Sequence, residues 1–167
     1  MIEEKFLNPL RIIYSRMENQ QAGRLNWVIT GSLGMALQGM ELAVHDIDLQ
    51  TDKEGAYEIE RRFSEYVVKP VRYLPSERIR SHFGALAIGG VKVEIMGDLQ
   101  QRLDDQTWEE PVKVELHKLW VGIDGMQIPV LSLEHEYRAY FLMGRIKKAE
   151  MLRQESGWKS NMRYYIV

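Results

Sequence analysis

The chain of 167 residues contains no cysteine, which excludes disulfides, thiolate zinc sites and cysteine nucleophiles. It has no run of the roughly 20 apolar residues that a bilayer crossing requires. The first segment, MIEEKFLNPLRIIYSRM, has no apolar core of the kind found in secretory signals. We therefore expect a cytoplasmic protein that does not enter a membrane.

Neither sign of charge dominates. The formal net charge is -2, which argues against wholesale binding of nucleic acid and leaves room for a local basic patch. Hydrophobic residues make up 45% and charged residues 28% of the chain, a globular composition. With no internal repeat or linker, we expect one domain over residues 1–167, with a core of about 27–152.

Periodicity predicts alternating helices and strands. Apolar spacing favours a helix over 5–20, Ser32 is the expected N-cap of a helix over 33–38, and helices follow Asp52 and Ser132. Strand patterns cover 27–30, 43–51, 67–74, 82–88, 91–96, 112–123 and 126–130. The order predicts an α/β (α+β) domain, a mixed sheet flanked by helices with a C-terminal helix.

Two aspartates stand two residues apart in the second expected strand, HDIDL. Alternation places Asp46 and Asp48 on one face and Ile47 on the other. Neighbouring carboxylates repel each other, and strands are depleted in aspartate. A solvent-facing strand end is the alternative, but the pair favours a divalent metal site.

A Gly31-Ser32 turn precedes these aspartates, between a strand and a helix. Glycine lets a phosphate approach the backbone, and the helix start offers N–H donors. Ser32 adds a hydroxyl. The same dipeptide is also an ordinary way to turn into a helix.

A third carboxylate, Glu94, lies in the expected strand VKVEIM, on the face opposite Val93. If this strand pairs beside the Asp46–Asp48 strand, three carboxylates meet. Such a set can hold two Mg²⁺ ions roughly 3.5–4 Å apart, which clamp a transferring phosphoryl or nucleotidyl group.

The combination of GS, a short helix, HDIDL thirteen residues after Ser32, and a later VEIMGD resembles the nucleotidyltransferase superfamily that includes DNA polymerase beta. It is most similar to small prokaryotic members, near antibiotic adenylyltransferases and AbiEii-type toxin proteins. The closing segment IPVLSLEHEYRAYFLMGRIKKAE resembles the same branch.

The resemblance implies a metal-dependent transfer of a nucleoside monophosphate from a nucleoside triphosphate, such as ATP, to an acceptor hydroxyl. Asp46 and Asp48 would bind both Mg²⁺ ions, Glu94 would bind the catalytic ion, and Gly31 and Ser32 would hold the nucleotide. Glu94 is also placed to accept the hydroxyl proton. The acceptor is not named by the sequence.

The last helix departs from the family pattern. Relatives carry a lysine about one and a half turns into this helix, where the chain has Tyr140, and an aspartate near the position of Lys148. Arg145, Lys147 and Lys148 either supply the missing positive charge from a shifted register or form a solvated face.

Two other functions are compatible with the same fold. One is a non-catalytic nucleotide-binding or regulatory domain, and the other is a toxin–antitoxin component with a protein partner. The aromatic tail Trp158–Val167 either packs on the domain or forms a dimer contact, and an exposed tail would favour a protein partner.

Overall fold

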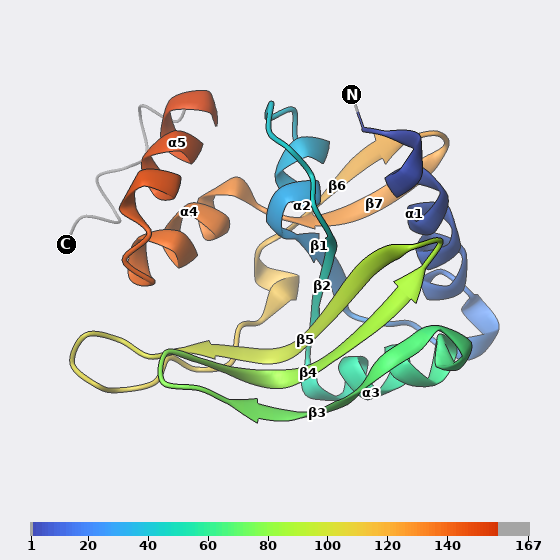
Figure 1. Ribbon diagram of the computed structural model, residues 1–167, viewed down its shortest axis with the longest axis horizontal. Helices are drawn as coiled ribbons and strands as arrows, with labels where there is room; N and C mark the ends of the chain where they lie inside the picture. The colour runs from blue at the N-terminus through green and yellow to red at the C-terminus, as the bar shows by residue number, and fades with distance from the viewer. Residues whose placement is uncertain (1, 157–167) are drawn as a thin grey trace.

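The computed structural model describes residues 2–156 and shows a seven-stranded sheet with helices around it (Figure 1). The helices are α1 (Glu4–Met17), α2 (Gly31–Leu37), α3 (Lys53–Arg62), α4 (Leu133–Leu142) and α5 (Ile146–Ser156). The strands are β1 (Trp27–Thr30), β2 (Ile47–Thr51), β3 (Val67–Pro75), β4 (Ile79–Ile88), β5 (Val91–Gln101), β6 (Lys118–Ile123) and β7 (Met126–Leu131). The predicted fold class is confirmed.

The sheet has the strand order β3-β4-β5-β2-β1-β7-β6. The pairs β2–β5 and β1–β7 are parallel and the remaining pairs are antiparallel, so the sheet is mixed as predicted. The two expected hairpins form at Gly89-Gly90 and Asp124-Gly125, where all four residues have positive φ. Such turns match the twist of paired strands.

Helix α1 buries the stripe that its spacing predicts. Its buried side chains include Phe6, Leu10, Ile13 and Met17. They belong to the main core cluster, which also contains Ile59 of α3 and Phe63 directly after it. The N-terminus of α3 is capped as expected, because the Asp52 carboxylate accepts a hydrogen bond from the Gly55 N–H at 2.6 Å.

A separate apolar cluster anchors α4 and α5. It joins Tyr137, Tyr140 and Leu152 to Met35 of α2 and to Met40. The two helices therefore stand at the opposite side of the sheet from α1 (Figure 1). Their position is fixed by packing and not only by the chain connection.

Several predicted boundaries are wrong, and one of them is the end of β5, which runs to Gln101 instead of Met96. Strand β2 begins at Ile47 instead of Ala43, and β6 begins at Lys118 instead of Val112, after a 3₁₀ turn at Val114–Leu116. The helical segment after Ser132 is two helices, because Gly144 has a φ of +74°. That conformation suits glycine and ends a helix.

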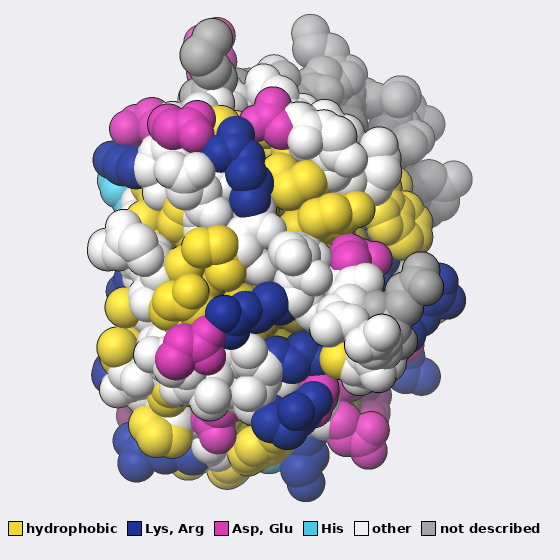
Figure 2. Space-filling view, turned by 90° about the vertical axis from the view of Figure 1, so that its right-hand side faces the viewer, with side chains coloured by type: hydrophobic (Ala, Val, Ile, Leu, Met, Phe, Trp, Pro, Cys, Tyr) yellow, Lys and Arg dark blue, Asp and Glu magenta, His cyan; other side chains and the backbone are white. Residues whose placement is uncertain are grey.

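The face that carries α1 mixes charges of both signs with apolar side chains (Figure 2). Arg11 pairs with Glu4 and Asp124, and Arg16 pairs with Glu65. Within residues 2–156, none of the helices is long and apolar enough to cross a membrane.

One buried guanidinium ties α3 to the end of α1. Arg62 donates to the carbonyl oxygens of Arg16, Met17, Ala22 and Gly23 at 2.9–3.3 Å and to Glu58 at 2.9 Å. Only 5% of its side chain is exposed. Its neighbour Arg61 is exposed and bonds only Glu58.

We predict that Arg62→Met lowers the free energy of unfolding by about 2–4 kcal/mol, because buried carbonyls lose charged donors. Arg61→Met is the matched control and is expected to change little. Urea denaturation at pH 7 measures both. Equal effects of the two substitutions would contradict the anchoring role of Arg62.

Candidate active site

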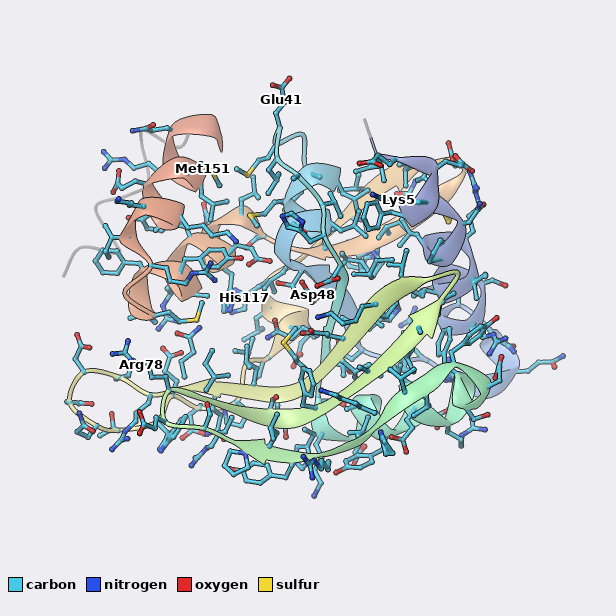
Figure 3. The ribbon with its side chains drawn as sticks, viewed as in Figure 1. Lys5, Glu41, Asp48, Arg78, His117 and Met151 are labelled. Atoms are coloured by element: carbon cyan, nitrogen blue, oxygen red, sulfur yellow. The ribbon has the colours of Figure 1, made fainter. Side chains whose placement is uncertain are left out.

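The parallel pairing of β2 with β5 brings two predicted carboxylates together. Asp48 is the register partner of Glu94, so the two side chains leave neighbouring strands. Asp48 lies near the centre of the molecule (Figure 3). Asp46 precedes β2 by one residue and reaches the same place, as its shared contact with Lys92 shows.

The Lys92 ammonium lies between two of these acids. Its Nζ is 3.3 Å from Asp46 Oδ2 and 2.8 Å from Glu94 Oε1. These contacts raise the pKa of Lys92, with the hydrogen bond to Glu94 as the largest cause. Among residues 2–156, no three His, Asp or Glu side chains stand in an arrangement that could hold a metal ion.

Asp48 has a raised pKa. Its pKa is raised to about 6, first by burial and then by the charges of Glu94 and Asp46, which outweigh the opposite effect of Lys92 and Lys148. The site therefore carries more negative charge than its own cations compensate. Such a site favours an added cation.

Gly31 has to be glycine for two reasons. Its φ is +68°, and a Cβ at this position would overlap Asp48 Oδ2. The backbone of the turn therefore lies in close contact with the Asp48 carboxylate. The predicted N-cap role of Ser32 is wrong, because α2 starts at Gly31 with Thr30 as its N-cap. Ser32 Oγ instead accepts a hydrogen bond from the His45 N–H at 3.4 Å.

Sequence reasoning missed a fourth carboxylate, Glu136. It is 4% exposed and accepts hydrogen bonds from Thr30 Oγ1 and from the Gly31 N–H, the latter at 2.8 Å. Burial raises its pKa to about 7. In the sequence, Glu136 follows Ser132 by four residues and looks like a solvated acid of a helix start, so only the tertiary contact reveals it.

A cleft of about 280 Å³ opens beside Gly31, Asp48 and Glu94. Its other walls come from β4, β5 and α4 and include apolar side chains, among them Ile79, Met96, Leu99, Val112, Leu131 and Met143. The cleft thus combines acidic and apolar walls, and Glu109 and Arg138 also line it. Its size is close to the lower end of the range for ligand pockets, about 300–1,000 Å³.

A wider groove of about 710 Å³ adjoins the cleft and shares Glu109, Val112, His135 and Arg138 with it. Five carboxylates line this groove, those of Asp52, Asp98, Glu109, Glu110 and Glu115. The rings of His117 and His135 lie 4.1 Å apart there. Burial lowers the pKa of His135 to about 4, so this ring is neutral at pH 7.

The expected lysine position in α4 holds Tyr140, and two cations lie over its ring. Arg145 Cζ is 5.1 Å and Lys148 Nζ is 4.7 Å from the ring centroid. Arg145 lines the cleft, and Lys148 is close enough to lower the pKa of Asp48. Lys147 is exposed. Two of the three candidate cations therefore face the site.

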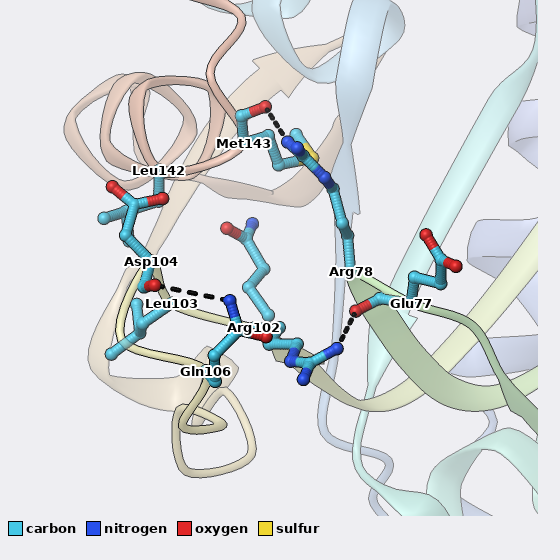
Figure 4. Close-up of a pocket in the computed structure, with 9 residues that line it drawn as sticks. Glu77, Arg78, Arg102, Leu103, Asp104, Gln106, Leu142 and Met143 are labelled. Carbon is cyan, nitrogen blue, oxygen red and sulfur yellow. Dashed lines mark hydrogen bonds between the residues drawn. The ribbon is translucent and has the colours of Figure 1, made fainter.

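A smaller cavity of about 240 Å³ lies at the far end of the cleft, with which it shares Gln101 and Met143 (Figure 4). Arg78 crosses its mouth and donates to the Met143 carbonyl at 3.4 Å. This contact ties β3–β4 to the end of α4. His82 is not among the residues that line the cleft, and it bonds Tyr57 Oη at 3.0 Å instead.

Comparison with known proteins gives a family match and several structural matches. The family model described as aminoglycoside-2″-adenylyltransferase matches residues 10–155. A crystal structure from Thermotoga maritima, provisionally named a nucleotidyltransferase, is 58% identical with a TM-score of 0.82, and the match covers 92% of this chain and 94% of that one. A comparison with curated proteins found no match.

Two more distant structures share the fold. ANT(2″)-Ia, solved with adenylyl-2″-tobramycin, is 15% identical with a TM-score of 0.59, over 89% of this chain and 88% of that one. The lincosamide antibiotic adenylyltransferase LnuA, bound to lincomycin, is 16% identical with a TM-score of 0.51, over 81% and 84% of the two chains. The resemblance to nucleotidyltransferases near the antibiotic adenylyltransferases is confirmed.

We predict that Asp48→Asn stabilises the metal-free protein at neutral pH. The folded-state pKa of about 6 lies above 3.8, the ordinary value for an aspartate, so ionised Asp48 disfavours the folded state. The gain in unfolding free energy is up to about 3 kcal/mol. It should be present above pH 6 and absent below pH 4.

Urea denaturation with EDTA at pH 7.5 and at pH 4 checks this sign. A destabilised variant at pH 7.5, or a gain of the same size at both pH values, would contradict the assigned cost of the Asp48 charge.

Proposed function

Because this chain belongs to the aminoglycoside-2″-adenylyltransferase family, we propose that it transfers a nucleoside monophosphate from a nucleoside triphosphate to a hydroxyl group of an acceptor, with the help of a divalent metal. The observation that carries the proposal is the meeting of Gly31, Asp48 and Glu94 at one cleft. They come from separate segments that β1, β2 and β5 align.

The chemistry of the acids fits a divalent cation. Lys92 already bridges Asp46 and Glu94 with a positive group. The pKa of Asp48 is raised by burial and then by the charges of Glu94 and Asp46, so an added cation would stabilise its ionised form. A cation held by all three acids requires Lys92 to withdraw. Two Mg²⁺ ions, bound by Asp46, Asp48 and Glu94, would lower the pKa of the acceptor hydroxyl and neutralise phosphate charge.

The residues have separate roles in the proposed reaction. Gly31 and Ser32 bind the nucleotide, and Arg145 and Lys148 bind its β- and γ-phosphates. The acceptor oxygen bonds to the α-phosphorus while the bond from that phosphorus to the bridging oxygen breaks, and pyrophosphate leaves. Glu94 accepts the hydroxyl proton.

The acidic groove suggests the acceptor. Its five carboxylates outnumber its two cations, Lys113 and Arg138, so the groove favours a positively charged molecule. The groove joins the cleft at Glu109, Val112, His135 and Arg138. The structure of ANT(2″)-Ia, which has the same fold, is a complex with adenylyl-2″-tobramycin. An amine-bearing antibiotic with free hydroxyls is therefore the acceptor class that we propose.

The rival functions remain open to test. A non-catalytic nucleotide-binding domain is favoured by Tyr140 at the expected lysine position, but Lys148 returns a positive charge to that place. A homodimer or a protein partner remains a prediction, as does the cytoplasmic location. The aromatic tail Trp158–Val167 lies outside the described residues.

Calorimetric titration of ATP with Mg²⁺ tests the metal site. We expect wild type to bind only with Mg²⁺, and Asp48→Asn to lose at least about 100-fold in affinity, because a ligand is gone. Asp105→Asn, on the loop after β5, is the matched control and should bind normally. Affinity for Mg²⁺ should fall below pH 6, where protons compete for Asp48.

Turnover is followed as pyrophosphate release with a panel of aminoglycosides. Metal-dependent binding without release for any hydroxylated amine would favour the regulatory function. Binding that Asp48→Asn leaves unchanged would mean that the assigned site is wrong.

The role of the cations is tested with a pair of adjacent lysines. We predict that Lys148→Met weakens tripolyphosphate binding by about 10–100-fold, because one charge-assisted contact to phosphate is lost. Lys147→Met removes an exposed cation and should have no effect. Equal losses in both variants would show that only general charge matters.

A further inference from the structure

Two buried glutamines in the cleft lack hydrogen-bond partners. Gln50 is 3% exposed and Gln101 is 5% exposed, and both line the cleft. Within the described chain, Gln50 Nε2 and Gln101 Oε1 are buried without a partner. Gln50 thus has an unused buried donor and Gln101 an unused buried acceptor.

The fold itself does not account for these amides. Buried polar groups are nearly always hydrogen-bonded, so unsatisfied ones call for a functional explanation. The adjacent residue of β5, Gln100, shows the usual arrangement. Its amide accepts from Arg80 Nε at 2.9 Å and donates to the Glu109 carbonyl at 2.8 Å. An apolar residue would suit positions 50 and 101 better unless a ligand completes them.

The surroundings suit a flat heterocycle. The apolar walls are Ile79, Met96, Leu99, Val112, Leu131 and Met143. Met96 is the register partner of Gln50, and Ile79 is the partner of Gln101. Arg78 fixes the Met143 end through the carbonyl contact. An uncharged ring can stack against such walls while its polar edge meets the amides.

The position along the strand fits the base of the nucleotide better than the acceptor. Gln50 follows Asp48 by two residues and faces the same way, as Met96 follows Glu94. The part of the cleft beside Gln50 therefore begins next to the acids that hold the α-phosphate in the proposed reaction. The charged acceptor has its own acidic groove, which adjoins the cleft at Glu109, Val112, His135 and Arg138 and extends to His117 and Glu110.

We propose that Gln50 and Gln101 bind the edge of the nucleobase and set the nucleotide preference. The donor of Gln50 and the acceptor of Gln101 match a Watson–Crick edge on which an amine stands beside a ring nitrogen that accepts, as in adenine and cytosine; in guanine that ring nitrogen carries a hydrogen and donates. The assignment rests on the proposed function, since it takes the cleft to be the site for a nucleoside triphosphate.

The test is calorimetric titration of ATP, CTP, GTP and UTP with Mg²⁺. We expect wild type to bind ATP or CTP at least about tenfold more tightly than GTP and UTP, as one or two well-formed hydrogen bonds allow. Gln50→Leu and Gln101→Leu should each reduce this preference to less than about threefold. Gln100→Leu is the matched control and should keep the wild-type preference.

The two glutamine variants are expected to fold, and their Tm without nucleotide should equal or exceed that of wild type, because an unsatisfied amide is removed. A wild-type preference for GTP or UTP, or a preference that survives in both variants, overturns the proposal. Binding of tripolyphosphate separates the two hypotheses. If wild type binds tripolyphosphate with Mg²⁺ and the glutamine substitutions do not change the nucleotide preference, only the assignment of the base site is wrong. If wild type binds neither tripolyphosphate nor any nucleoside triphosphate, the proposed function is wrong as well.

Discussion

The site depends on one pairing, the parallel alignment of β2 with β5. It sets Asp48 beside Glu94, and burial then raises the pKa of Asp48 to about 6. Three other residues of the site are arranged around these carboxylates. Gly31 leaves room for the Asp48 carboxylate, Lys92 bridges two of the acids, and Lys148 approaches from α5. The fold stores repulsion that a divalent cation would relieve.

The break between α4 and α5 determines where the cations of the site lie. A single straight helix would carry residues after Gly144 away from the cleft. The positive φ of Gly144 turns the chain, and the Arg145 N–H bonds the Tyr140 carbonyl at 2.9 Å. Arg145 and Lys148 then lie over the ring of Tyr140. The break between the helices therefore places two cations beside Tyr140, the position at which the sequence pattern predicts a lysine.

Much of this architecture is visible in the sequence because it rests on local rules. Alternation places Glu94 on the correct face, the Gly89-Gly90 turn fixes the β4–β5 hairpin, and the stripe of α1 names its buried residues. What the sequence hides is long-range. Glu136 looks like an ordinary acid of a helix start until its bonds to Thr30 and Gly31 are seen. The missing hydrogen-bond partners of Gln50 and Gln101 are visible only in the assembled sheet, because local periodicity does not tell which buried polar atoms find a partner.

The most direct test of the central claim is anomalous diffraction from crystals grown with Mn²⁺ and a non-hydrolysable nucleoside triphosphate. We expect anomalous density within coordination distance of Asp46, Asp48 and Glu94, with the Lys92 ammonium moved away from its place between Asp46 and Glu94. Manganese bound elsewhere, or a nucleotide bound in the cleft with Lys92 still bridging these acids and no metal beside them, would contradict the account.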